Sequence, residues 1–143
     1  MTIKTATPYL ILSGKAEQAI VLYQRALGAT VETKMRFGDM DPNCPAATKD
    51  KVMHALLRFG SATLMLSDGG GDGSAPTPGV GNVNVEVALD ISDADEARRC
   101  FDALGVQGKV TMPLSPAPWG ALFGSLTDQF GIQWMFNVEL KPA

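Results

Sequence analysis

Apolar and polar positions along the chain predict two helices and eight strands. Two stretches carry apolar residues at helical spacing. The first covers residues 15–27 and ends before Gly28, and the second follows Ser92, a favourable N-cap residue, and ends at Gly105. Period-two alternation or short apolar runs indicate the strands. We expect them at residues 7–13, 30–37, 52–59, 62–67, 82–91, 107–112, 119–127 and 132–140.

The two halves of the chain have the same order of elements: strand, helix, and then three strands. Local similarity supports a duplication, because residues 16–19 (AEQA) resemble residues 94–97 (ADEA). We therefore predict an α+β fold in which two βαβββ modules form a single domain over residues 1–143. Module one covers residues 1–68, a Gly- and Pro-rich linker covers residues 69–81, and module two covers residues 82–143. Residues 38–51 and 113–118 are expected to be loops.

Strand parity predicts which polar side chains face a cavity between the two sheets. Neighbouring strand residues point to opposite faces, and the more apolar face of each strand should pack under its helix. The other face then holds a small polar set: His54, Asn84, Glu86, Gln133 and Asn137. A few polar groups among apolar walls are typical of a small-molecule site.

Composition excludes several classes of function. The chain has 143 residues, with 12 Lys and Arg against 15 Asp and Glu, for a formal net charge of −3, which argues against a nucleic-acid-binding face. One His, two Cys and no CxxC pair exclude a self-contained His/Cys zinc site. No apolar run approaches the ~18–20 residues that cross a bilayer, and the N-terminus lacks a secretory pattern. We expect a cytoplasmic protein without a membrane partner.

Several stretches resemble the vicinal oxygen chelate superfamily, which includes glyoxalase I, extradiol dioxygenases and bleomycin-resistance proteins. The most specific are residues 119–121 (WGA) and 126–135 (LTDQFGIQWM), and residues 9–19 (YLILSGKAEQA) and 51–55 (KVMHA) add to them. Within the superfamily the chain is similar to the PhnB-like branch, often labelled 3-demethylubiquinone 3-methyltransferase-like. The resemblance implies a glyoxalase-like curved mixed sheet made by paired βαβββ modules, a bound small molecule and a homodimer.

The resemblance also implies where a metal ion would bind. In the metal-using members, four His, Gln or Glu ligands come from the first and last strands of each module. The corresponding positions here hold Tyr9 or Leu10, Met65 or Ser67, Asn84 or Glu86, and Gln133 or Met135. This gives at best two ligands, Glu86 and Gln133, with His54 nearby. A divalent metal ion is therefore the only cofactor to consider, and we assign no residue as its ligand.

Two functions remain open at this point. The first is a small-molecule binding protein of the bleomycin-resistance kind, with the ligand between the modules. Its ligand-binding residues would be Arg36, Asn84, Trp119, Gln133 and Asn137. The alternative is a metal-assisted lyase, isomerase or dioxygenase-type enzyme in which His54 and Glu86 are the catalytic residues. A catalytic His needs a partner, and Glu86 is the acidic residue that strand parity sends inward. The incomplete ligand set favours the binding protein.

Overall fold

The structure, a computed structural model, describes residues 2–69 and 85–139. The chain divides into two compact units, Met1–Ala75 and Pro76–Ala143, and each is treated by itself. Most of the predicted linker, residues 70–81, and the predicted site residue Asn84 lie outside the described residues. The assignment of both units to a single domain stays a prediction.

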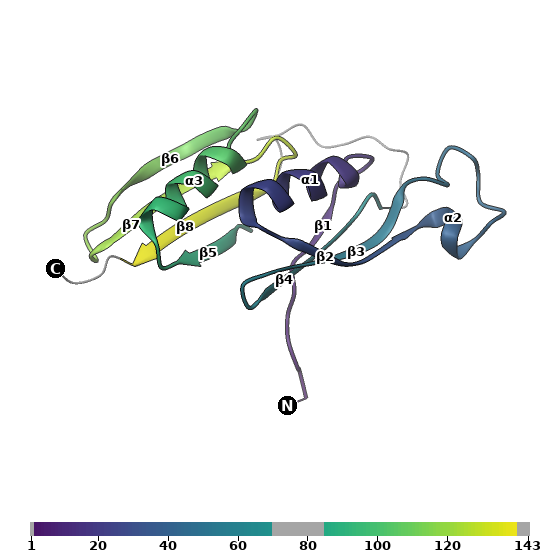
Figure 1. Cartoon of the computed structure of the whole chain (residues 1–143), viewed down its shortest axis with the longest axis horizontal. Helices are drawn as coiled ribbons and strands as arrows, with labels where there is room; N and C mark the ends of the chain where they lie inside the picture. Colours follow the sequence, from purple (N-terminus) through teal and green to yellow (C-terminus); the bar gives the residue numbers. More distant parts are fainter. Residues whose placement is uncertain (1, 70–84, 140–143) are drawn as a thin grey trace. The chain divides into compact units, whose positions relative to one another are not determined.

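The first unit is a four-stranded mixed sheet with one long helix (Figure 1). Its strands lie in the order β1-β4-β3-β2, with β1 parallel to β4 and the other neighbours antiparallel. The elements are β1 (Tyr9–Ile11), α1 (Ala16–Leu27), β2 (Thr30–Arg36), α2 (Phe37–Met40), β3 (Val52–Phe59) and β4 (Ala62–Ser67).

The second unit repeats this topology with the order β5-β8-β7-β6. Again the outer strand β5 is parallel to its neighbour β8, and the remaining pairs are antiparallel. The elements are β5 (Val87–Ile91), α3 (Ala94–Leu104), β6 (Lys109–Pro116), β7 (Ala121–Thr127) and β8 (Gln133–Glu139). The predicted α+β fold of two similar modules is thus confirmed.

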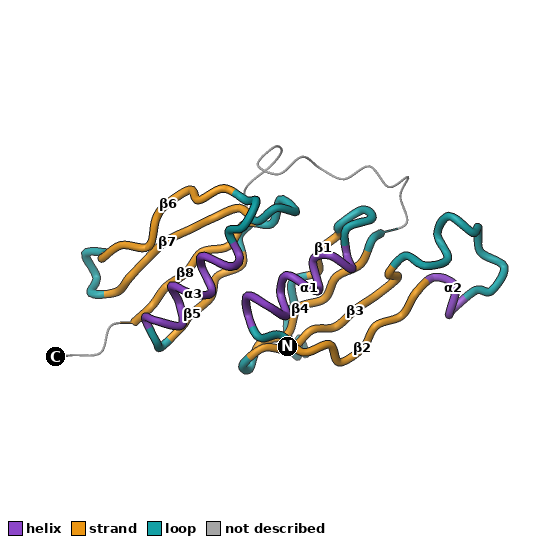
Figure 2. Tube along the Cα trace, turned by 45° about the horizontal axis from the view of Figure 1, so that its top comes forward, coloured by secondary structure: helices purple, strands orange, loops and turns teal. Residues whose placement is uncertain are grey.

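The two long helices, α1 and α3, each cover one face of the sheet in their own unit (Figure 2). In the first unit, alternate strand residues are fully buried on that face, as strand parity predicts, and Ala55 and Leu57 of β3 are examples. In the second unit, the same alternation buries Trp134, Phe136 and Val138 of β8, and the ring of Phe136 meets Phe101 of α3 edge to face at 5.0 Å. Burial of these large apolar side chains fixes the strand register, because a slip of one residue would expose all of them.

Several predicted boundaries differ from the structure. The N-cap of α3 is Asp93 rather than Ser92, because the Asp93 carboxylate accepts the free backbone N–H groups of residues 95 and 96. The expected Pro-rich loop at 113–118 belongs largely to β6, which continues to Pro116. Proline is tolerated there because β6 is an edge strand whose pairing with β7 is interrupted by register shifts. The expected loop at 38–51 begins within α2.

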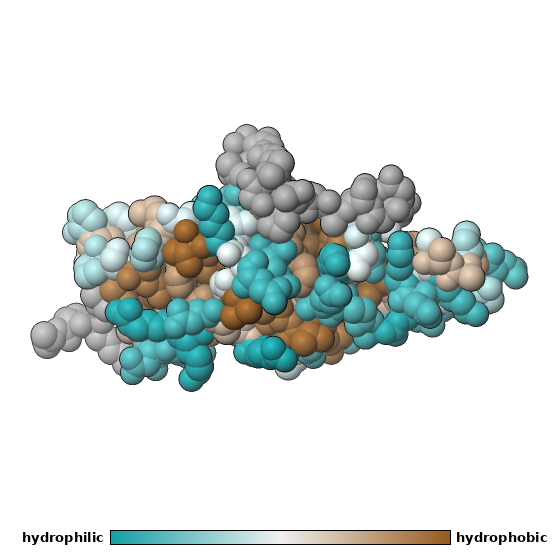
Figure 3. All heavy atoms as spheres, turned by 90° about the horizontal axis from the view of Figure 1, so that it is seen from above, coloured by the Kyte–Doolittle hydropathy of each residue, from teal (hydrophilic) through white to brown (hydrophobic). Residues whose placement is uncertain are grey.

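Hydrophobic side chains reach the surface between hydrophilic ones, as the space-filling view shows (Figure 3). The large hydrophobic residues with the most exposed side chains include Ile3, Val85 and Trp119. None of the helices in residues 2–69 and 85–139 combines the length and hydropathy needed to cross a bilayer.

Candidate functional site

In the first unit, the sheet face opposite α1 carries the chain's single histidine. The register pairs Tyr9 of β1 with Met65 of β4, and Met65 with Leu56 of β3. His54 lies two residues before Leu56 and therefore shares this face, as strand parity predicts. The side chains of His54, Leu56 and Met65 are half-buried, and Tyr9 is 42% exposed. The result is a mainly apolar surface with one imidazole and one phenol.

These two polar groups contact each other directly. The Tyr9 hydroxyl lies 3.1 Å from Nδ1 of His54, and the ring centroids are 5.6 Å apart at an interplanar angle of 39°. The partner of His54 within the first unit is thus a tyrosine, Tyr9. Glu86, one residue before β5, belongs to the second unit, so its pairing with His54 remains a prediction.

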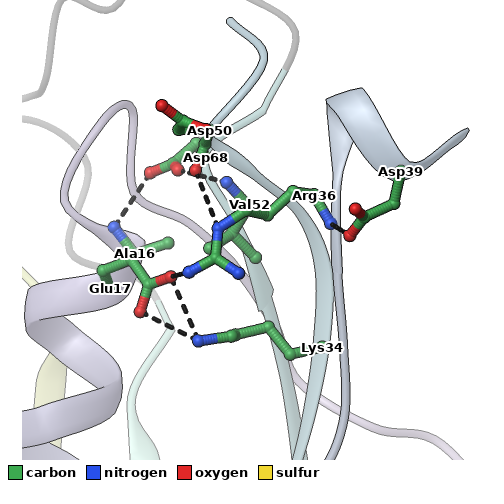
Figure 4. Close-up of polar contacts among 8 residues, drawn as sticks. All are labelled: Ala16, Glu17, Lys34, Arg36, Asp39, Asp50, Val52 and Asp68. Atoms are coloured by element: carbon green, nitrogen blue, oxygen red, sulfur yellow. Dashed lines mark hydrogen bonds and ion pairs between the residues drawn. The ribbon is translucent and has the colours of Figure 1, made fainter. Parts of the chain in front are cut away.

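Arg36, a predicted ligand-binding residue, lies in a polar network at the edge of the first sheet (Figure 4). Its guanidinium donates to the Glu17 carboxylate of α1 and to the backbone carbonyl of Asp50, at 3.2 Å. Lys34 donates to the same Glu17 carboxylate at 3.1 Å, and Asp39 accepts the backbone N–H of Arg36 at 3.0 Å. The network joins α1, β2 and the segment before β3, and contact of Arg36 with a ligand stays a prediction.

Another arginine on this sheet is paired in the same way. Arg58 of β3 donates two hydrogen bonds to the Glu32 carboxylate of β2. The hydrogen bond from Arg58 lowers the pKa of Glu32, and the same contact raises the pKa of Arg58. Both groups are solvent-exposed, so this ion pair orients two side chains rather than adding much stability.

A buried carboxylate holds the framework behind the histidine. Asp68, which follows β4 and is 6% exposed, accepts backbone N–H groups from Gly14 at 2.8 Å, Ala16 at 2.9 Å and Val52 at 2.8 Å (Figure 4). It therefore ties the start of α1 to the first residue of β3, two positions before His54. The sequence did not single out Asp68, and its only signal there was an acidic residue directly after an apolar strand.

In the second unit, the face opposite α3 carries an exposed tryptophan with two contacts. Asn137 of β8 and Phe123 of β7 are register partners. The indole N–H of Trp119 donates to the Asn137 side-chain oxygen at 3.2 Å, and the Trp119 ring meets Phe123 nearly edge-on at 5.7 Å. Trp119 is nevertheless 64% exposed. The structure thus brings together two predicted ligand-binding residues and adds Phe123, which strand parity could have placed on this face.

The remaining predicted site residues are less closely joined. Gln133 is half-buried at the start of β8, opposite Thr127 of β7. Glu86 is exposed one residue before β5 begins. The expected convergence of His54, Glu86 and Gln133 on one cavity involves both units and stays a prediction.

Comparison with known proteins decides the family. The model of the Glyoxalase/Bleomycin resistance protein/Dioxygenase superfamily matches residues 6–136. The chain belongs to this superfamily. The predicted resemblance is confirmed.

Two superfamily relatives cover nearly the whole chain. Protein YjdN of Escherichia coli (strain K12) is 34% identical over 142 residues, covering 92% of this chain and 93% of YjdN. The crystal structure of protein PA1353 from Pseudomonas aeruginosa has 40% identity and a TM-score of 0.79, covering 97% of this chain and 100% of that one.

Two further structures share the superfamily fold at lower identity. One is a putative 3-demethylubiquinone-9 3-methyltransferase, PhnB protein, from Bacillus cereus, with a TM-score of 0.75, 24% identity, and 94% and 99% coverage. The other is the fosfomycin resistance protein FosX from Listeria monocytogenes, with a TM-score of 0.64, 10% identity, and 98% and 96% coverage. At these identities the likeness concerns the fold alone.

The donors in the part of the chain that the structure describes do not fit the metal centre of the superfamily's metal-using members. Among residues 2–69 and 85–139, no group of three or more His, Cys, Asp or Glu side chains could hold a metal ion. At the positions that the superfamily uses, Tyr9 is a phenol already hydrogen-bonded to His54, and Met65 offers only a soft thioether. We therefore assign no chemical step to a metal ion.

Proposed function

We propose that this chain is a small-molecule binding protein without an assigned reaction, and that its ligand lies against the sheet faces opposite α1 and α3. The superfamily assignment supports the binding of a small molecule. The finer proposal names the residues: His54 and Arg36 of the first unit, and Asn84, Trp119, Gln133 and Asn137 of the second.

One observation carries this proposal: Trp119 is held in place and yet exposed. Leaving an indole in water forfeits most of the free energy that its burial would supply. The hydrogen bond to Asn137 and the edge contact with Phe123 nevertheless restrict its orientation. An oriented aromatic ring on a half-buried sheet face is suited to stacking on a flat part of a ligand.

Tryptophan fluorescence tests the proposal directly, because the chain has only two tryptophans. Trp134 is fully buried and donates to Asp128 at 2.9 Å, so a ligand on the sheet surface should alter Trp119 emission instead. Suitable fluorescence probes are fosfomycin and the aromatic acid benzoate, because neither emits where tryptophan does. Bleomycin, whose bithiazole is itself fluorescent, is tested by calorimetry. We expect a saturable change with at least one probe.

Matched variants identify the site. Trp119→Phe should abolish the fluorescence change, and Asn137→Ala should weaken binding by about three- to tenfold, the value of one hydrogen bond. Val106→Ala, another exposed apolar residue of the second unit, should leave affinity unchanged. Saturable binding with full affinity in Trp119→Ala, measured by calorimetry, or no binding of any probe, would contradict the proposal.

We also propose that the protein is a cytoplasmic homodimer that needs neither a membrane nor a nucleic acid as a partner. Light scattering coupled to size exclusion should give twice the chain mass of 15.1 kDa. Elemental analysis addresses the enzymatic alternative that uses His54 and Glu86. One equivalent of a divalent metal per chain, lost in His54→Ala, would favour that alternative, and no described contact favours it at present.

A further inference from the structure

The contact between Tyr9 and His54 determines which hydrogen bond the histidine offers to a ligand. The Tyr9 hydroxyl lies at Nδ1 and leaves Nε2 as the outer ring nitrogen. Among the described residues Nε2 has no hydrogen-bond partner, and the contact itself is solvent-exposed. In a neutral imidazole one nitrogen carries the proton and the other accepts, and the partner of one nitrogen selects the tautomer.

The phenol is the better donor of the two groups. Its oxygen lone pair is delocalised into the ring, which makes the hydroxyl a strong donor and a weak acceptor. Among residues 2–69 and 85–139, this hydroxyl makes no other hydrogen bond. These two features favour donation from the hydroxyl to Nδ1, which would place the imidazole proton on Nε2.

We propose that Tyr9 is a positioning residue that holds His54 in the Nε2–H tautomer, so that His54 donates a hydrogen bond to an oxygen of the ligand. The proposal rests on the proposed binding function and adds the ligand's chemistry: an acceptor oxygen of a carboxylate, phosphonate or carbonyl group near a flat or apolar part. The neighbouring side chains of Leu56 and Met65 provide the apolar contact.

The contact between Tyr9 and His54 also distinguishes a binding protein from an enzyme that uses His54 as a base or metal ligand. A general base or a metal ligand needs a free lone pair on an imidazole nitrogen. In the Nε2–H tautomer the only lone pair is on Nδ1, where the Tyr9 hydroxyl occupies it. His54 then serves as a donor, and it does so in the imidazolium form as well, because Nε2 keeps its proton.

Nuclear magnetic resonance can read the tautomer without any ligand. The chain has a single histidine, so a long-range ¹H–¹⁵N spectrum of the ¹⁵N-labelled protein contains one imidazole and needs no assignment. We expect an acceptor-type shift for Nδ1 and a protonated-type shift for Nε2 in the neutral ring. In Tyr9→Phe the two shifts should move towards each other as the tautomers mix.

Tyr23→Phe is the matched control, because it removes the chain's other phenol, on the buried face of α1, and should leave both nitrogen shifts in place. An Nδ1–H tautomer in the unchanged protein would overturn the proposal. Identical imidazole shifts in Tyr9→Phe and the unchanged protein would also overturn it. The nitrogen shifts can be measured even if no probe binds. They therefore distinguish a wrong tautomer assignment from a wrong proposed function.

Benzoate tests the ligand chemistry, with benzylamine as the probe that keeps the ring and replaces the acceptor by a donor. Benzoate should bind and benzylamine should not. His54→Gln retains an N–H donor and should keep benzoate affinity within about threefold, whereas His54→Ala should lose about three- to tenfold. Tighter binding of benzylamine, absence of benzoate binding, or unchanged benzoate affinity in His54→Ala would overturn the assigned ligand class.

Discussion

The two units have one topology but begin their long helices in different ways. In the second unit, Asp93 caps α3 with its own carboxylate, 2.9 Å from the backbone N–H of Asp95. In the first unit, the N-cap residue of α1 is Lys15, which provides no side-chain cap. Asp68 provides the acceptor instead: it lies 52 residues after Ala16, whose backbone N–H it accepts. The start of α3 is therefore stabilised locally, and the start of α1 depends on the completed sheet.

The units also differ at the turn between their last two strands, where the second unit has a buried carboxylate and the first does not. Asp128, at the turn between β7 and β8, is fully buried and accepts backbone N–H groups from Phe130 at 2.9 Å and Ile132 at 3.0 Å. It also accepts the indole N–H of Trp134. The corresponding turn of the first unit, between β3 and β4, needs no such acceptor because Gly60 and Ser61 close it directly. Among residues 2–69 and 85–139, each unit has one buried aspartate, and the two stabilise different parts of the repeat.

Replacing Asp68 should have the largest effect. Asp68→Ala leaves three backbone N–H groups without their acceptor, two of them in buried contacts, and each unsatisfied group costs about 1–3 kcal/mol. We expect a loss of about 4 kcal/mol in the free energy of unfolding, measured by urea denaturation. Asp39→Ala is the control, because this exposed carboxylate accepts a single N–H and should cost less than about 1 kcal/mol. A loss below about 1 kcal/mol in Asp68→Ala would refute the long-range cap.

Asp128→Ala should have the next largest effect, a loss of about 3 kcal/mol in the free energy of unfolding. The loss is smaller than for Asp68 because the backbone N–H groups of Phe130 and Ile132 lie in a turn where water can replace the carboxylate. Hydrogen exchange distinguishes the two aspartates. Loss of Asp128 should speed exchange mainly within residues 128–134, whereas loss of Asp68 should speed it in both α1 and β3. Faster exchange throughout the second unit after Asp128→Ala would show that this carboxylate also acts beyond its turn. Asp41→Ala, which removes an exposed acceptor of one N–H, is the matched control.

The N-caps of α3 and α1 predict a smaller difference in stability between variants at Asp93 and Lys15. Asp93→Ala removes an N-cap acceptor and should cost about 1 kcal/mol. Lys15→Ala, at the equivalent position before α1, should change stability by less than about 0.5 kcal/mol, because Lys15 makes no capping hydrogen bond. Thermal unfolding of the two variants is sufficient to compare them. Equal losses would contradict the assignment of the α1 cap to Asp68.

The elements that the sequence predicts correctly are those set by local periodicity. Helical spacing indicates both long helices, and alternation places Ala55, Leu57, Trp134 and Phe136 on the buried faces. The backbone conformation at the ends of the helices is predicted less well. Gly28 ends α1 in a left-handed conformation at φ 67°, as expected for a C-terminal glycine, whereas Gly105 remains right-handed after α3 at φ −82°.

Side-chain partners that depend on tertiary contacts could not be predicted in this way. The contact of Tyr9 with His54 joins residues 45 positions apart on different strands, and a phenol was not considered as a partner because only acidic partners were weighed. The pairing of His54 with Glu86 of the other unit stays a prediction. Asp68 was missed for the same reason, since the backbone N–H groups that donate to its carboxylate come from two distant segments. By contrast, Trp119 and Asn137 were both predicted as ligand-binding residues, and their mutual hydrogen bond adds a contact that parity alone does not reveal.

The two cysteines provide a last and smallest comparison between the units. Cys44 lies half-buried in the segment after α2, and Cys100 is buried on α3. Burial raises the pKa of the Cys100 thiol, the nearby Glu96 carboxylate adds to this rise, and Arg99 opposes it. The thiolate is the reactive form, so Cys100 should react with Ellman's reagent at pH 8 more than about tenfold more slowly than Cys44. Cys44→Ala isolates the slow reaction, and equal rates for the two thiols would contradict the burial of Cys100.

The raised pKa of Cys100 also predicts a weak dependence of stability on pH. The thiol ionises at a lower pH in the unfolded chain than in the folded one, so the folded state favours the neutral form. The stability that this form contributes is present below the unfolded pKa and is lost as the pH rises through the folded pKa. Urea midpoints should therefore fall less between pH 8 and about pH 10 in Cys100→Ala than in the unchanged protein. In Cys44→Ala the urea midpoint should fall with pH as steeply as in the unchanged protein. An equally steep fall in Cys100→Ala would show that ionisation of the Cys100 thiol does not contribute to the pH dependence of stability.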